Sequence, residues 1–144
     1  MCIASMFSGL ALANAKLGAV HGLAAPLGGV FSAPHGAICA RLLPFVIEMN
    51  IGLLIKNNSS SDFLKRFDTV AQILTNNANT SAMDAVSWAK NICREMKIPP
   101  LNEFGLKESS IPEIVQQAKK SSSTKGNPVE LTDNDLTHIL RQAL

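Results

Sequence analysis

The sequence predicts an all-α fold, a helical bundle of about six helices near the typical length of ~11 residues. Apolar residues recur at three- and four-residue steps in several segments, which is the period of an α-helix. Three segments begin with Ser or Thr followed three residues later by Asp or Glu, the pattern of a capping box. No segment alternates apolar and polar residues as a half-buried strand does. We expect a single domain over residues 1–144, long enough to bury one core.

The first predicted helix covers residues 2–18 and is expected to be buried. Its large apolar side chains follow the helical period, and small residues separate them on nearly every side. These large residues are Ile3, Met6, Phe7, Leu10 and Leu17. A helix with so small a cross-section can approach its neighbours closely, so we expect it at the centre of the bundle.

The segment 17–40 carries five of the nine glycines, two of the seven prolines and no charged residue. Glycine frees the backbone and proline removes a hydrogen-bond donor, so both disfavour a continuous helix. We expect one helix to end near His21, a Gly/Pro loop to follow, and another helix to begin at Pro34-His35. That helix is expected over residues 36–50, where Pro44 should bend or divide it.

A polar connection should follow, and the remaining helices occupy residues 62–144. The residues of this connection are Asn50, Asn57, Asn58 and Ser59–Ser61. A helix with an apolar stripe then begins at Asp62.

The later helices begin at capping patterns. These patterns are Ser81 with Asp84, Ser110 with Glu113, and Thr132 with Asp135. The helix after Ser81 carries Trp88, which we expect to anchor it in the core. The last helix is predicted over residues 133–143.

Two of the three histidines, His21 and His35, flank the Gly/Pro loop and are candidate metal ligands. Imidazole pairs suit a transition metal such as iron or zinc. The two are 35 − 21 = 14 residues apart, so a shared metal requires the loop to fold back and bring both rings to one side of the bundle. The alternative is that each is a capping or core histidine satisfied by backbone carbonyls. His138 on the last helix is expected to be a surface or half-buried residue without a catalytic role.

Composition argues against several classes of partner. The net charge is only +2, and no cluster of Lys and Arg is interleaved with aromatic residues, so nucleic-acid binding is not expected. The uncharged N-terminal run holds too many Gly and Pro for a transmembrane helix, which needs about 20 unbroken apolar residues. We expect a cytoplasmic protein without membrane insertion. Cys2, Cys39 and Cys93 lack CxxC spacing and should stay reduced, the last two as small core residues.

Several strings, taken in order along the chain, carry a resemblance to a known family. They are GAVHGLAAPLGG at 18–29, PHG at 34–36, LP at 43–44, IPPL at 98–101 after Trp88, and KGNPVELT at 125–132. With these strings the sequence resembles the iron-containing (group III) alcohol dehydrogenases over nearly all of its length. The resemblance implies the C-terminal helical domain of a longer enzyme, whose N-terminal part this chain does not contain.

The resemblance also implies a metal, Fe²⁺ or Zn²⁺, held by one Asp and three His beside a nicotinamide cofactor. His21 and His35 match the last two of these ligands, and the Asp and the first His are expected upstream of this chain. NAD(P) is bound in the family mainly by a separate α/β domain, so no cofactor-binding residue is assigned here. A further family histidine, four residues after His21, falls on Ala25, which calls a histidine proton relay there into question.

Two functions are compatible with these observations. The first, implied by the resemblance, is the metal-binding C-terminal portion of an iron-dependent, NAD(P)-linked oxidoreductase acting on primary alcohols or aldehydes. We expect the isolated chain to be inactive, and to bind metal weakly or not at all because no acidic residue precedes Glu48. The second is a non-catalytic helical module that associates with itself or another protein through the apolar N-terminal helix.

Overall fold

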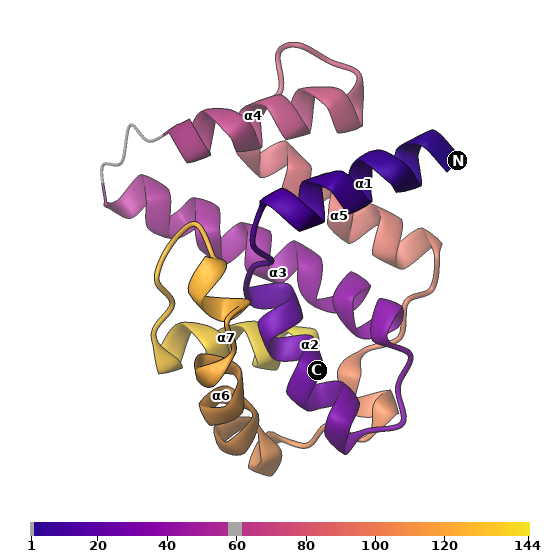
Figure 1. Cartoon of the computed structure of the whole chain (residues 1–144), viewed down its shortest axis with the longest axis vertical. Helices are drawn as coiled ribbons and strands as arrows, with labels where there is room; N and C mark the ends of the chain where they lie inside the picture. The colour runs from indigo at the N-terminus through magenta and orange to yellow at the C-terminus, as the bar shows by residue number, and fades with distance from the viewer. Residues whose placement is uncertain (1, 58–61) are drawn as a thin grey trace.

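A computed structural model describes residues 2–57 and 62–144. Within these ranges the chain forms seven α-helices and three short 3₁₀-helices and contains no β-strand (Figure 1). The α-helices are α1 (Cys2–Asn14), α2 (Ala19–Val30), α3 (His35–Lys56), α4 (Asp62–Thr75), α5 (Ala82–Glu95), α6 (Ile111–Lys120) and α7 (Asp133–Ala143). The 3₁₀-helices are η1 (Leu101–Phe104), η2 (Glu108–Ser110) and η3 (Thr124–Gly126). The predicted all-α fold is confirmed.

The main hydrophobic core lies where α2, α3, α6 and α7 meet. α2 packs against α3 and α6, and α7 packs against the same two helices. Fully buried side chains from all four helices fill this core, among them Leu23, Leu27, Ile38, Leu42, Ile114, Leu136, Ile139 and Leu140. Burying apolar surface stabilises a fold by about 25 cal/mol per Å². These contacts therefore hold α2 and α3 in one relative position.

A smaller hydrophobic cluster joins α4 and α5 to the second half of α3. Ile51 of α3 is buried with Ala82 and Val86 of α5, and Leu64 and Phe67 of α4 pack against them. α3 thus belongs to both cores and contacts α2, α4, α5 and α7. It is long and apolar enough to cross a membrane, and in this fold it is the helix against which α2, α4, α5 and α7 pack.

Pro44 does not divide α3, which runs from His35 to Lys56 instead of over residues 36–50. A proline cannot donate a hydrogen bond to the carbonyl four residues earlier, which here belongs to Ala40. The thiol of Cys93 on α5 donates a hydrogen bond to that carbonyl oxygen at 3.2 Å. A neighbouring helix thus satisfies the group that Pro44 leaves free, and α3 continues.

The Gly/Pro segment is more helical than predicted. α2 begins at Ala19 and continues through Pro26 to Val30, so His21 lies in the first turn of a helix and not near the end of one. Gly22 is required for packing, because a Cβ at this position would lie 1.9 Å from Oγ1 of Thr124. The loop between α2 and α3 is correspondingly short, and His35 is the first residue of α3.

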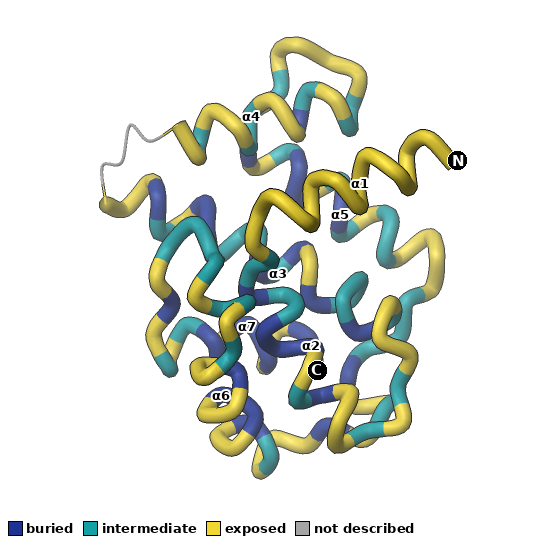
Figure 2. The backbone as a smooth tube through the Cα atoms, viewed as in Figure 1, coloured by how far each residue is buried: buried dark blue, intermediate teal, exposed yellow. Residues whose placement is uncertain are grey.

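The prediction that the first helix is buried at the centre of the bundle is wrong. α1 ends at Asn14 and none of its residues is buried, and Figure 2 shows it in the exposed colour along its length. Its large apolar side chains are about half exposed or more, from Leu10 at 52% to Ile3 at 68%. Helical periodicity predicted the helix correctly but carries no information about what covers it. No other element among the described residues covers α1.

The capping predictions hold at two helices of three. The carboxylate of Asp84 accepts hydrogen bonds from the amide and hydroxyl of Ser81 at 2.8 and 3.0 Å, which lower the pKa of Asp84. Asp135 accepts from Thr132 in the same way, and the Thr132 hydroxyl accepts from the Asp135 amide. Ser110 precedes α6 as predicted, but its backbone is already helical and its side chain makes no capping bond.

Two further expectations need correction. Asn50 does not belong to a polar connection, because it lies inside α3 and is only 4% exposed. Asn57 caps the C-terminal end of that helix, and residues 58–61 of the expected connection lie outside the described residues. Trp88 is half-buried and not a core residue, because the buried face of α5 consists of Ala82, Ala85, Val86 and Ala89.

A pair of leucine substitutions tests this division between core and surface. Leu23→Ala on α2 removes a fully buried side chain and should lower the free energy of unfolding by about 2–5 kcal/mol, the usual cost of such a cavity. Leu12→Ala on α1 removes a side chain that is 54% exposed and should change it by less than about 0.5 kcal/mol. Urea denaturation measures both, and equal losses would contradict the exposed placement of α1.

Candidate metal centre

The two predicted histidine ligands lie beside each other. His21 is in the first turn of α2 and His35 is the first residue of α3. Their ring centroids are 5.5 Å apart, with the ring planes tilted by 51°. The expectation that the loop brings both imidazoles to one side of the bundle is confirmed. Two capping histidines without a common role would not need this proximity.

Cys39 joins the pair as a third potential metal ligand. It follows His35 by four residues, so both side chains lie on the same face of α3, and its Sγ lies 3.4 Å from Nε2 of His35. The nearest ligand atoms of His21, His35 and Cys39 all lie within 4.8 Å of one another. His35 is exposed and the other two are half-buried, which leaves the cluster open to solvent on one side.

The prediction that Cys39 is a small core residue describes only part of its surroundings. It packs against the main core as a partly buried side chain, while its sulfur contacts the histidine. Burial raises the pKa of the Cys39 thiol above its ordinary value. The spacing of His35 and Cys39 by one helical turn was the signal that could have revealed the contact.

This set of donors fits a transition metal. Metal–nitrogen bonds are about 2.0–2.1 Å and metal–sulfur bonds about 2.3 Å, which places ligand atoms roughly 3–4 Å apart around one ion. The ligand atoms within 4.8 Å are close to that spacing, so small side-chain rotations suffice. Imidazole and thiolate suit zinc and iron and are poor ligands for magnesium or calcium.

Asn127 fixes the position of the helix that carries His21. Its Oδ1 accepts a hydrogen bond from the amide of Ala19, the first residue of α2, at 3.1 Å. Its Nδ2 donates to Oδ1 of the buried Asn50 at 2.7 Å and to the carbonyl of Val129 at 2.8 Å. This network links α2, α3 and the segment after η3. Its contact with α2, at Ala19, lies two residues before His21. Sequence reasoning did not identify it, because asparagine in a Gly-Asn-Pro string is typical of turns.

The glycine before Asn127 belongs to the same contact. A Cβ on Gly126 would lie 2.4 Å from the carbonyl oxygen of Leu17, so a side chain there would push the segment away from the start of α2. His138 takes no part in this centre. It is exposed on α7, as the predicted surface position requires, and lines a separate hollow with Glu48 and Gln142.

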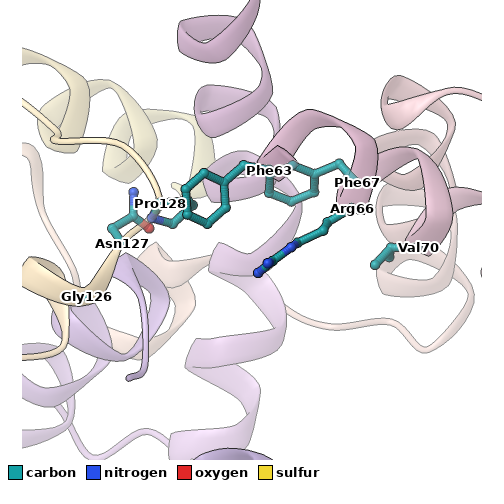
Figure 3. Close-up of a pocket in the computed structure, with 7 residues that line it drawn as sticks. All are labelled: Phe63, Arg66, Phe67, Val70, Gly126, Asn127 and Pro128. Carbon is teal, nitrogen blue, oxygen red and sulfur yellow. The ribbon is translucent and has the colours of Figure 1, made fainter. Parts of the chain in front are cut away.

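A second hollow of about 330 Å³ lies between α4 and the segment 126–128. Figure 3 shows the residues that line it: Phe63, Arg66, Phe67, Val70, Gly126, Asn127 and Pro128. The guanidinium of Arg66 lies 5.5 Å from the centre of the Phe63 ring. The lining is mostly apolar and contains no histidine, cysteine or carboxylate, so this hollow offers no metal ligand of those types.

The chain is similar to known proteins over its whole length. The family described as the Fe-containing alcohol dehydrogenase family, C-terminal, matches residues 1–144. The 1,3-propanediol dehydrogenase of Citrobacter freundii is 34% identical over 149 residues, covering 99% of this chain and 36% of that protein. The lactaldehyde reductase of Escherichia coli (strain K12) is 31% identical over 153 residues, covering 99% of this chain and 37% of that protein. The chain therefore spans little more than a third of the length of these relatives.

Solved structures show the same fold. A crystal structure of 1,3-propanediol oxidoreductase matches with a TM-score of 0.75 and 30% identity, covering 89% of this chain and 33% of that one. An alcohol dehydrogenase from Oenococcus oeni matches with a TM-score of 0.81 and 32% identity, covering 96% of this chain and 36% of that one. The helical arrangement described above is thus shared, over most of this chain, with one part of these longer chains.

The role of Asn127 in holding α2 can be tested by Asn127→Ala. The substitution leaves the Ala19 amide and the buried Asn50 without their partner and should lower the free energy of unfolding by about 1–3 kcal/mol. The ring-proton NMR signals of His21 should shift, while those of His138 should not. Asn91→Ala, at an exposed position on α5, serves as the control and should change stability by less than about 0.5 kcal/mol. Unchanged stability and unchanged His21 signals in Asn127→Ala would exclude this role.

Proposed function

Because the chain belongs to the Fe-containing alcohol dehydrogenase family, we propose that it is the metal-binding C-terminal portion of an NAD(P)-linked oxidoreductase. The observation that carries this proposal is the proximity of His21 and His35 at 5.5 Å between ring centroids, inside the region that matches the family. Two imidazoles from the first turns of neighbouring helices form part of a metal site, which other ligands complete.

The chemistry that a bound divalent ion supplies is Lewis-acid polarisation of a substrate oxygen. The chain's own residues hold and orient that ion. His21 is fixed through the α2 anchor at Asn127, and His35 through the packing of α3 in both cores. Ala25, one turn after His21 and exposed, has no group that transfers a proton. The proposed contribution of this segment is therefore metal binding, without a proton relay at that position.

Short alcohols or aldehydes are the proposed substrates. Two relatives are named for the oxidation of 1,3-propanediol and the reduction of lactaldehyde, both small molecules with a primary alcohol or an aldehyde group. NAD(P) is proposed to bind mainly outside this segment. In residues 2–57 and 62–144 there is no β-strand, and a strand followed by a glycine-rich turn is what a dinucleotide-binding fold requires.

The proposed ligand role of the histidines predicts a selective loss of metal binding. His21→Ala and His35→Ala should each weaken Zn²⁺ binding to the chain by at least about tenfold, measured by titration calorimetry. Removing a group that only supports a metal ligand already weakens metal binding by about 10- to 100-fold, so loss of a ligand itself should cost at least as much. His138→Ala is the matched control, because His138 is an exposed histidine outside the cluster, and it should leave the affinity unchanged. Equal affinities in all three variants would refute the assignment.

The activity of the proposed enzyme should depend on the rest of a longer chain. The 144 residues with Fe²⁺, NAD⁺ or NADP⁺ and 1,3-propanediol should give no change in nicotinamide absorbance. Grafted in place of the matching region of the Citrobacter freundii 1,3-propanediol dehydrogenase, the same residues should support hydride transfer, and His35→Ala in the graft should abolish it.

Two results would contradict this account of activity. One is robust cofactor reduction by the 144-residue chain alone. The other is a graft that binds NADH and transfers hydride equally well with and without the His35→Ala substitution. NADH binding by the graft serves as the control that its nucleotide domain is folded.

A further inference from the structure

Cys39 lies where it can add a third metal ligand to the pair of histidines. Its Sγ is 3.4 Å from Nε2 of His35, and its distance to the nearest nitrogen of His21 is within the same 4.8 Å limit that encloses the whole cluster. The three residues come from two helices whose relative position is set by the main core and by Asn127. A cysteine one turn along α3 from His35 can bind an ion together with it, since residues four apart share a helix face.

A divalent ion between the two histidines also needs negative charge from a ligand. Two neutral imidazoles leave the +2 charge of a divalent ion uncompensated, and no acidic residue precedes Glu48 in the sequence. The metal-ligand cluster among the described residues contains no carboxylate. A cysteine binds metals as a thiolate, so Cys39 is the group in this cluster able to contribute both a third bond and a negative charge.

We propose that Cys39 is a metal ligand, and that His21, His35 and Cys39 together form a three-ligand site that binds Zn²⁺ without any other part of a longer protein. The proposal rests on the proposed ligand role of the two histidines and adds the sulfur to it. On binding, the S–H bond is replaced by a sulfur–metal bond, the proton passes to solvent, and no group is oxidised or reduced. Three protein ligands leave one position of a tetrahedral ion open, on the side where His35 is exposed.

The site also specifies which ions it accepts. Thiolate favours zinc and cobalt over magnesium and calcium, which prefer oxygen ligands. Weak or absent metal binding by the isolated chain was expected from its imidazole and carboxylate ligands alone, without a sulfur ligand. With a sulfur ligand from the same helix as His35, the chain holds Zn²⁺ by itself.

Cys93 offers a matched control. Like Cys39 it is half-buried, and burial raises the pKa of both thiols. Its thiol donates to the Ala40 carbonyl, a hydrogen bond that a serine hydroxyl can replace. Cys2 is exposed on α1 and would bind added metal independently, so it is replaced by serine in every protein tested.

The experiment is a titration of the Cys2→Ser protein with Co²⁺, followed by displacement with Zn²⁺. Cobalt bound to sulfur gives a thiolate-to-metal charge-transfer absorption in the near ultraviolet, which imidazole ligands do not produce. We expect this absorption in the parent and after Cys93→Ser, and its loss after Cys39→Ser. Zn²⁺ affinity, from competition with a chromogenic chelator, should fall at least about tenfold in Cys39→Ser, the smaller effect known for groups that only support metal ligands. Far-ultraviolet circular dichroism checks that each variant keeps the helical fold.

Three results would overturn the proposal. They are Co²⁺ binding without the charge-transfer absorption in the parent, loss of that absorption in Cys93→Ser instead of Cys39→Ser, and no binding of either metal by the parent. The first leaves the two histidines as ligands and the proposed function intact, because His21→Ala would still weaken binding. The last also removes the histidine assignment for the isolated chain, while hydride transfer by the graft still decides the proposed function separately.

Discussion

The candidate centre depends on one constraint, the attachment of the first turn of α2 to the segment that follows η3. Asn127 accepts a hydrogen bond from the amide of Ala19, and its side chain both donates to and accepts from the buried Asn50 of α3. Gly126 permits the close approach because a side chain there would collide with Leu17. This attachment sets where α2 begins, and therefore where His21 lies relative to α3. A contact between residues more than a hundred positions apart, 127 and 19, thus positions His21 on one helix against His35 and Cys39 on another.

Residues that usually interrupt helices have packing roles here, and this explains where prediction from sequence failed. Pro44 remains inside α3 because Cys93 of α5 satisfies the carbonyl of Ala40. Gly22 remains inside α2 because Thr124 fills the space where its Cβ would be. Local rules treat each residue alone and so predicted a broken helix and a loop. The compensating groups lie on other elements, so no rule applied to residues 17–44 alone could have included them.

The sequence predicted best what depends on neighbouring residues. The capping pair of Thr132 and Asp135 and the apolar period after it located α7 over the observed Asp133–Ala143. The histidine pair was a candidate from its position on either side of the Gly/Pro segment, and the resemblance matched both residues to family ligands. Their proximity required only that the chain between α2 and α3 fold back. Burial was harder to predict. α1 has the composition of a core helix, yet none of its residues is buried, because the period of a helix shows which side chains share a face and not which surface meets that face.

The electrostatics of the cluster explain why the third ligand matters more than its single bond suggests. His21 and His35 lie in the first turns of α2 and α3, and the start of an α-helix carries a partial positive charge of roughly half an electron. Side chains lean toward the N-terminal end of their helix, so Cys39 on the second turn of α3 also directs its sulfur toward that end. The partial positive charges of these two helix starts disfavour a bare divalent ion. Neutral imidazoles do nothing to offset this repulsion, whereas a thiolate bound to the ion adds a negative charge beside it. The sulfur of Cys39 therefore lowers the cost of placing a metal beside the two histidines in two ways, by binding the ion and by adding the negative charge that the imidazoles lack.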